Sequence, residues 1–293
     1  MKSFIWLLLG SLVAAALLSY TLKANKKMLP AKADEYVHCT YTDVRDIANL
    51  EAATKEFAAL HADPNNFVLK DAKGKAVTFS TSDGQKANGY EIKSNKKSKN
   101  YLLVIHEWYG LNDYIKQESD LLSNELNNIN IIALDLYDGK VASTADSAMK
   151  YMSGAKTDRL ESIIKGAIAY AGNDAKIYTI GWCFGGMWSL QASILAGKQG
   201  AGCVMYYGRP ETNIDKLKQL NTDVIGFFGN QDKSILPEMV TQFENVMRAA
   251  GKKLTDYRYD AAHGFANPSN PAFNKEARED AHKKTIAYLK ARI

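Results

Sequence analysis

One short segment has the residue types and spacing of a nucleophilic site. After the apolar run Ile177–Ile180, the chain reads Gly-Trp-Cys-Phe-Gly-Gly over residues 181–186 and continues into a helix-like segment. Glycines two positions before and after Cys183 predict a tight strand-to-helix turn that lifts the thiol clear of a sheet, because a Cβ at either position would strike the turn. The amino-terminal end of the following helix favours the thiolate. A buried structural cysteine in a glycine-rich turn is the alternative.

A base and an acid follow the cysteine along the chain. A thiol nucleophile needs a base to take its proton and a third group to orient that base. His263 is the candidate base because it lies between a predicted strand and the last predicted helix. Asp232 directly follows the apolar run Val224–Phe228 and is the expected acid, with Asp260 as the second choice. The order nucleophile, acid, histidine is that of the α/β-hydrolases. The remaining histidines are expected at the surface or in the core: His38, His61, His106 and His282.

A second loop follows the apolar run Tyr101–Ile105. It reads His-Glu-Trp-Tyr-Gly over residues 106–110. In an α/β-hydrolase, a loop at this position supplies one oxyanion amide and the residue after the nucleophile, here Phe184, supplies the other. Glu107 is either a solvent-facing charge or a carboxylate that keeps the thiol protonated or accepts its proton. Gly110 stands where a zinc-binding HExxH motif needs its second histidine, so neither a metal nor another cofactor is expected.

The elements that position these residues alternate between strands and helices. Near-continuous apolar strands joined by helical crossovers predict a mostly parallel sheet covered by helices on both faces. Together with the order of Cys183, Asp232 and His263, this favours the α/β-hydrolase fold. Ligands bind such sheets beyond the carboxyl ends of the strands, where Cys183, Asp232 and His263 are expected. The expected strands are 101–105, 129–134, 177–180, 201–206, 224–228 and 254–259. The expected helices are 112–127, 157–172, 184–197, 236–250 and 273–291.

The amino-terminal third is organised differently. Residues 4–20 carry no charge and follow a lone Lys2, which is typical of a secretory signal peptide ending near Ala24 or of an uncleaved membrane anchor. The expected location is therefore periplasmic or secreted, with anchoring by the N-terminus as the alternative. Residues 25–65 are expected to form a helical extension, and residues 66–293 the hydrolase domain. Short runs at 67–70, 76–80 and 88–92 predict an antiparallel meander at the sheet edge.

Composition sets the remaining bounds. The 293 residues are 46% hydrophobic and 24% charged, as in an ordinary globular protein. The net charge of +5, from 37 basic and 32 acidic residues, is too small and too dispersed to indicate nucleic-acid binding. Three cysteines cannot form a disulfide framework. Cys203 is expected to be a small core residue, and a bridge from Cys203 to Cys39 in the extension is the alternative.

Taken together, these motifs resemble the dienelactone hydrolase family over about residues 66–293. The matching segments are Gly181–Gly186, Glu107–Gly110, Asp135–Tyr137, Tyr206–Gly208, Gly229–Asp232 and His263–Ala266. The resemblance implies a triad of Cys183, His263 and Asp232. It also implies that Glu107 gates the thiol and that the Phe184 and Trp108 amides form the oxyanion hole. The implied substrate is a small ester or enol lactone, which Cys183 attacks to form an acyl-thioester that water hydrolyses. Tyr109 and Tyr207 lie in the matching segments and are expected to line the substrate site.

The chain departs from the family where its members hold a substrate carboxylate. Asn267 stands in place of the arginine of a His-x-Phe-x-Arg run, and no arginine lies between Asp138 and Lys150, where Lys140 is the nearest cation. Asparagine cannot bind a carboxylate as arginine does, and lysine does so less well. Hydrolysis is therefore expected without a preference for a dicarboxylate lactone. The alternatives are an inactive binding protein on the hydrolase scaffold, a thioester hydrolase and a redox-sensing thiol.

Overall fold

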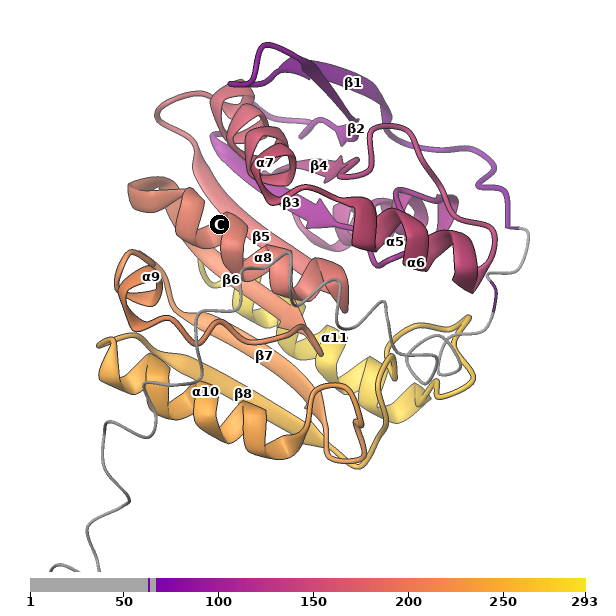
Figure 1. Cartoon of the computed structure of the whole chain (residues 1–293). Coiled ribbons are helices and arrows are strands. Elements are labelled where there is room, and N and C mark those ends of the chain that lie inside the picture. The colour runs from indigo at the N-terminus through magenta and orange to yellow at the C-terminus, as the bar shows by residue number, and fades with distance from the viewer. Residues whose placement is uncertain (1–62, 64–66) are drawn as a thin grey trace, which may run out of the picture. The chain divides into compact units, whose positions relative to one another are not determined.

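A computed structural model describes Asp63 and residues 67–293. The predicted leader 1–24 and nearly all of the 25–65 extension lie outside the described residues. The described chain forms an eight-stranded sheet in the order β1-β2-β4-β3-β5-β6-β7-β8 (Figure 1). The strands are β1 Lys75–Ser80, β2 Lys86–Ile92, β3 Asn100–Ile105, β4 Asn130–Leu134, β5 Lys176–Trp182, β6 Gly200–Tyr206, β7 Val224–Gly229 and β8 Leu254–Tyr259.

Helices connect the strands and cover both faces of the sheet. They are α5 Asp113–Glu125, α6 Ala145–Gly154, α7 Thr157–Ala171, α8 Phe184–Leu195, α9 Ile214–Lys218, α10 Pro237–Ala249 and α11 Lys275–Lys290, with a short 3₁₀ helix at Gly197–Gln199. Strands β3 to β8 are parallel, whereas β2 pairs antiparallel with both β1 and β4. In Figure 1, α8 lies in front of the sheet and α11 behind it. The predicted α/β-hydrolase fold is thereby confirmed.

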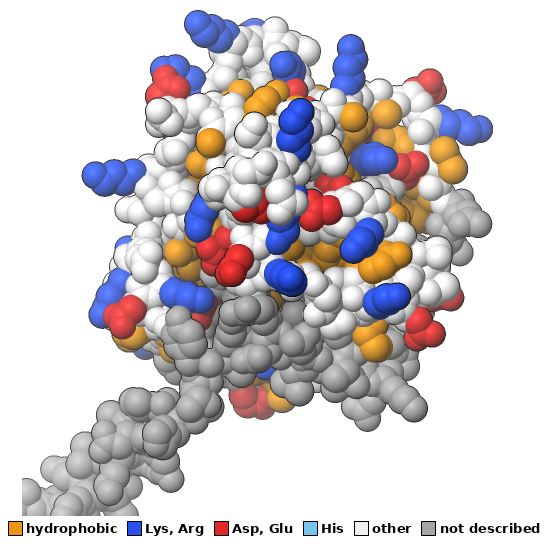
Figure 2. All heavy atoms as spheres, turned by 45° about the horizontal axis from the view of Figure 1, so that its top comes forward, with side chains coloured by type: hydrophobic (Ala, Val, Ile, Leu, Met, Phe, Trp, Pro, Cys, Tyr) orange, Lys and Arg blue, Asp and Glu red, His pale blue; other side chains and the backbone are white. Residues whose placement is uncertain are grey.

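Burial on two faces explains why the central strands were readable from sequence. All five residues of β4 and all six of β7 are buried, so no polar alternation is needed. Cys203 is a free thiol buried in β6, with its sulfur 3.7 Å from the Ser189 hydroxyl, as expected of a core residue. On the face in Figure 2, basic and acidic side chains are interspersed. Within the described chain, no helix is long and apolar enough to cross a membrane.

The structure corrects the prediction for one strand. Residues 67–70 do not form a strand; they run irregularly beside the start of α5. The Phe67 ring stacks on Tyr114 with centroids 4.7 Å apart, and the Leu69 amide donates to Asp113 Oδ2 at 3.0 Å. The Phe67 ring and the Leu69 backbone therefore contact a helix instead of a sheet edge, and the Val68 side chain is exposed. The sequence analysis also missed α6, whose N-terminus carries a capping box formed by Thr144 and Ser147.

Candidate active site

The turn between β5 and α8 holds Cys183 in a strained conformation. Its backbone has φ 54° and ψ −118°, a region that non-glycine residues rarely occupy. A Cβ at Gly181 would lie 2.1 Å from the Gly185 carbonyl oxygen, and one at Gly185 would lie 2.2 Å from that of Ile105. The two glycines therefore allow the close approach that the turn requires. Phe184 opens α8, so its amide is among those with no acceptor inside the helix.

His263 and Asp232 form a buried hydrogen-bonded pair. His263 Nδ1 lies 2.7 Å from Asp232 Oδ2. The other carboxylate oxygen, Oδ1, accepts from the Ser234 and Ile235 amides, each at 2.8 Å. Because a carboxylate only accepts, Nδ1 carries the proton and Nε2 is the nitrogen that can receive one from a thiol. Asp260, the second choice for the acid, is exposed and accepts from Gln231 at 2.6 Å instead.

Electrostatics couple the imidazole to the sulfur. Burial opposes a charge on His263, but the Asp232 carboxylate and Cys183 outweigh this effect and raise the pKa of His263 well above its usual value. Cys183 and His263 are only 4% and 3% exposed. Water is therefore largely excluded from the pair, which strengthens their interaction.

Glu107 faces this pair from the loop after β3. Its Oε2 accepts from Asn267 Nδ2 at 2.5 Å and its Oε1 from the Tyr207 hydroxyl at 3.3 Å. Burial raises the pKa of Glu107, and the opposing effects of His263, Asn267 and Tyr207 do not cancel that rise. The sequence analysis named Asn267 only as a missing arginine, and nothing in the sequence indicated that its amide would hold Glu107.

The neighbouring residue His106 is a satisfied core histidine. Its Nδ1 lies 2.5 Å from the Glu107 carbonyl oxygen, and its Nε2 accepts from the Leu136 amide at 3.2 Å. Burial lowers the pKa of His106 to about 4, so the ring is neutral at neutral pH. His106 therefore supports the loop that carries Glu107 and takes no part in proton transfer.

The two tyrosines expected at the substrate site lie beside the triad. Tyr207 has φ 35°, and its ring packs edge-on against His263 with centroids 5.1 Å apart. Tyr109 packs against Trp108, the expected second oxyanion residue, with ring centroids 5.1 Å apart. Burial raises the pKa of Tyr109, and the charges of Asp63, Glu107 and Cys183 raise it further. Both tyrosines therefore lie close to the reacting groups.

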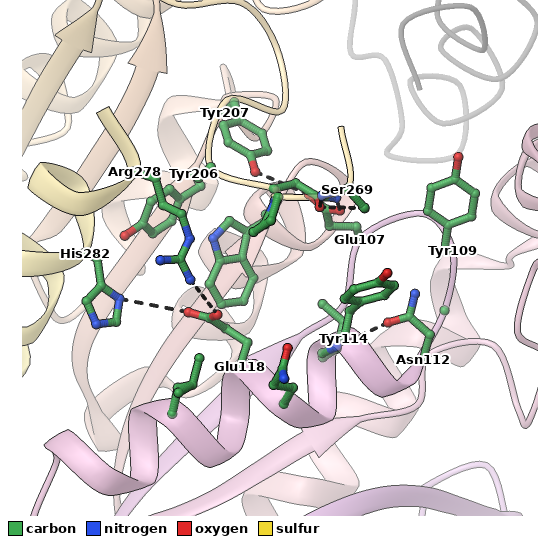
Figure 3. Close-up of a pocket in the computed structure, with 18 residues that line it drawn as sticks. Glu107, Tyr109, Asn112, Tyr114, Glu118, Tyr206, Tyr207, Ser269, Arg278 and His282 are labelled. Carbon is green, nitrogen blue, oxygen red and sulfur yellow. Dashed lines mark hydrogen bonds and ion pairs between the residues drawn. The ribbon is translucent and has the colours of Figure 1, made fainter. Parts of the chain in front are cut away.

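Two hollows flank these residues. The first, which we call the α5–α11 cavity, encloses about 880 Å³ of empty space with its open side included. Figure 3 shows Glu107, Tyr207 and Ser269 near one end of it and Glu118, Arg278 and His282 toward the other. The second, which we call the basic cleft, is lined by residues that include Tyr137, Lys140, Lys150, Tyr151 and Lys156 and encloses about 1100 Å³. Among the described residues, no group of three or more potential metal ligands occurs.

Comparisons with known proteins identify the family and support the fold. Residues 88–293 match the dienelactone hydrolase family. A protein of Saccharolobus solfataricus assigned as a carboxymethylenebutenolidase is 26% identical over an alignment of 254 positions. The alignment covers 72% of this chain and 96% of that one. A dienelactone hydrolase-like promiscuous phosphotriesterase from metagenomic libraries has the same fold, with a TM-score of 0.64 and 18% identity over 75% of this chain and 99% of its own. An esterase of Pyrococcus furiosus superposes with a TM-score of 0.59 and 16% identity, over 78% and 97% of the two chains.

Proposed function

The chain belongs to the dienelactone hydrolase family, a hydrolase family whose members act on small-molecule esters or lactones, and we propose that it cleaves these bonds through a Cys183–His263–Asp232 triad. The observation that carries the proposal is the 2.7 Å bond between His263 Nδ1 and Asp232 Oδ2. That bond orients the imidazole so that Nε2 can serve the thiol held at the start of α8.

The first half of the reaction forms an acyl-enzyme. His263 Nε2 takes the proton of the Cys183 thiol, and the sulfur attacks the carbonyl carbon of the ester. The carbonyl oxygen becomes an oxyanion, which the backbone amides of Phe184 and Trp108 stabilise. The tetrahedral intermediate then collapses: the C–O bond to the leaving group breaks, and His263 returns the proton to that oxygen. An ester gives a free alcohol and an acyl-thioester on Cys183, whereas an enol lactone gives one product, a thioester on Cys183 whose acyl group carries the ring-opened enol.

Water completes the cycle. His263 takes a proton from a water molecule, whose oxygen attacks the thioester carbonyl and displaces the sulfur. The proton returns to the thiolate, and the acyl group leaves as a carboxylic acid. Glu107 contributes in the resting state, where an ionised carboxylate beside the sulfur favours the neutral thiol because a thiolate would add a second negative charge. The same carboxylate is a second acceptor for the thiol proton.

The test uses variants that keep the fold. We expect Cys183→Ala and His263→Ala to abolish hydrolysis of an activated ester such as 4-nitrophenyl acetate, with an unchanged circular dichroism spectrum. Wild-type protein quenched during turnover should gain the mass of one acetyl group on the peptide containing Cys183. Full activity in Cys183→Ala would overturn the nucleophile, and ligand binding without turnover by the wild type would instead favour an inactive binding protein.

We also propose that the hydrolase is exported, either to the periplasm or medium after cleavage near Ala24 or as a membrane-anchored protein. The support is the uncharged run 4–20 behind Lys2. Mass spectrometry of the protein recovered from fractionated cells tests this proposal. A mature N-terminus near residue 25 outside the cytoplasm supports cleavage, and a full-length chain in the membrane fraction supports the anchor. A full-length chain in the cytoplasm would contradict both.

A further inference from the structure

Aromatic rings form one part of the wall of the α5–α11 cavity, and polar and charged side chains form another. The rings come from the loop after β3, from α5 and from the carboxyl ends of β5 and β6. These rings belong to Tyr109, Tyr114, Trp182, Tyr206 and Tyr207. Ile115 and Leu121 on α5 add aliphatic surface, and Leu121 is 41% exposed. Small-molecule sites combine apolar and aromatic side chains with a few polar groups, and the lining of this cavity has both kinds.

The charged groups of this cavity are already paired. Arg278 Nη2 lies 3.2 Å from Glu118 Oε2, and the ion pair is visible in Figure 3. His282 Nε2 lies 2.5 Å from Glu125 Oε1. A ligand carboxylate would have to compete with Glu118 for Arg278, whereas an uncharged ring would leave the pair intact. At the other end, Asn267 presents a neutral amide to Glu107, whose pKa is raised by burial.

Two residues that neighbour the proposed triad line the cavity, although Cys183, His263 and Asp232 themselves do not. Glu107 and Tyr207 line it, and the Tyr207 ring packs directly against His263. A group bound in the cavity therefore lies one side chain away from the imidazole. The basic cleft also adjoins the nucleophile: burial and then the charge of Cys183 raise the pKa of Tyr137, whose ring centroid is 5.4 Å from that of Phe184.

We propose that the α5–α11 cavity binds an uncharged aromatic or similarly apolar group of the ester substrate. This inference rests on the proposed hydrolysis and names the substrate class: neutral aryl or alicyclic esters rather than carboxylate-bearing ones. Aromatic walls gain from stacking on such a group, and a cavity without an unpaired cation among its described residues gains nothing from a carboxylate, which it would have to desolvate.

The kinetic test uses a matched pair of esters and a matched pair of variants. Phenyl acetate and 4-carboxyphenyl acetate differ by one carboxylate, and vinyl acetate is a small ester that needs no cavity. We expect the wild type to prefer phenyl acetate by about tenfold or more in kcat/KM. Leu121→Trp, which narrows the cavity far from the sulfur, should lower kcat/KM for phenyl acetate about tenfold through KM and leave vinyl acetate unchanged. Asn124→Trp, on the same helix outside the cavity lining, should change neither.

A binding test separates this inference from the catalytic proposal. Benzyl alcohol and benzoate are titrated into Cys183→Ala protein and detected by saturation-transfer NMR. We expect saturable binding of benzyl alcohol, weaker binding of benzoate, and loss of the benzyl alcohol signal in Cys183→Ala/Leu121→Trp.

The outcomes of the two tests separate the proposals. If benzyl alcohol binds as expected but the wild type hydrolyses no ester, the catalytic proposal is overturned and the cavity remains a site for apolar ligands. A kcat/KM for phenyl acetate that is unchanged by Leu121→Trp would overturn the cavity proposal. A preference for the anionic ester that Lys140→Ala or Lys150→Ala removes would also overturn it and would assign the substrate to the basic cleft.

Discussion

Asn267 holds Glu107 by a 2.5 Å hydrogen bond from its amide nitrogen to one carboxylate oxygen. The orientation of this amide is fixed because its oxygen accepts from the Ser269 amide at 2.9 Å and from the Ser269 hydroxyl at 2.7 Å. A neutral donor stabilises the carboxylate only partly and does not compensate its charge. Burial therefore dominates, and the pKa of Glu107 is raised.

Replacing Asn267 should shift the pH dependence of the reaction. A guanidinium in Asn267→Arg favours ionised Glu107 and lowers its pKa, so the acid limb of the kcat/KM profile for a neutral ester should move to lower pH. Asn267→Leu removes the hydrogen bond and should move that limb to higher pH. Ser269→Ala removes the hydroxyl but keeps the backbone amide that donates to Asn267 Oδ1, so it should shift the limb less than Asn267→Leu does. Coincident acid limbs in all four proteins would show that Glu107 does not titrate in catalysis.

Glu107→Gln should stabilise the protein at alkaline pH. The folded-state pKa of Glu107 lies above its usual value, so the stability of the wild type is highest while the group is protonated and is lost as pH rises through the folded-state pKa. Glutamine cannot ionise and can still accept from Asn267 and donate to Tyr207. Calorimetry at about pH 8 should give a higher Tm for Glu107→Gln than for the wild type, with the difference shrinking towards about pH 4. A lower Tm for the variant at the higher pH would contradict this.

Asp232→Asn should impair catalysis without unfolding the protein. Asn Oδ1 can still accept from the Ser234 and Ile235 amides, but the negative charge of the Asp232 carboxylate beside His263 is lost. The pKa of His263 should fall, and kcat should drop by roughly 10² to 10⁴ because the imidazole loses its orienting acceptor. Asp260→Asn, at the exposed second-choice carboxylate, is the matched control and should retain full kcat. Steady-state kinetics with NMR titration of the imidazole distinguish Asp232→Asn from Asp260→Asn. Equal kcat in the two variants would show that Asp232 is not the acid of the triad.

The positions of the triad residues were predictable because each follows a readable strand. Apolar runs buried on both faces identified the strands before Cys183 and Asp232, and the two glycines flanking Cys183 identified the turn. The strand before His263, Leu254–Tyr259, is half-buried along its length and carries polar residues. The triad assignment itself is a prediction that the activity measurements test. The run 67–70 was misread because Phe67 packs on α5 while Val68 is exposed, and a short apolar run does not reveal whether its partner is a sheet or a helix.

Contacts between distant segments were not predictable. Asn267 and Glu107 are 160 residues apart, and their hydrogen bond depends on how the loops after β3 and β8 meet. The α5–α11 cavity likewise forms between side chains of two helices, α5 and α11, and the ends of two strands. Spacing along the sequence places a residue on an element, but it does not say which elements share a cavity.

The tight turn should be sensitive to one added methyl group at Gly185. A Cβ there would lie 2.2 Å from the Ile105 carbonyl oxygen and 2.5 Å from that of His106, both of them backbone atoms that cannot rotate away. Gly185→Ala must therefore push the start of α8 away from the loop after β3, which carries Glu107. We expect a loss of about 1–3 kcal/mol in the free energy of unfolding, measured with denaturant. The folded protein that remains should lose about 10²-fold in kcat, because the sulfur and the oxyanion amides are displaced relative to each other.

Gly154→Ala, at the end of α6 with no atom within 4 Å of the added Cβ, is the control and should stay within about 1 kcal/mol of the wild-type free energy of unfolding and keep its kcat. Equal stability and kcat for both glycine variants would mean that the close approach at Gly185 does not hold the turn.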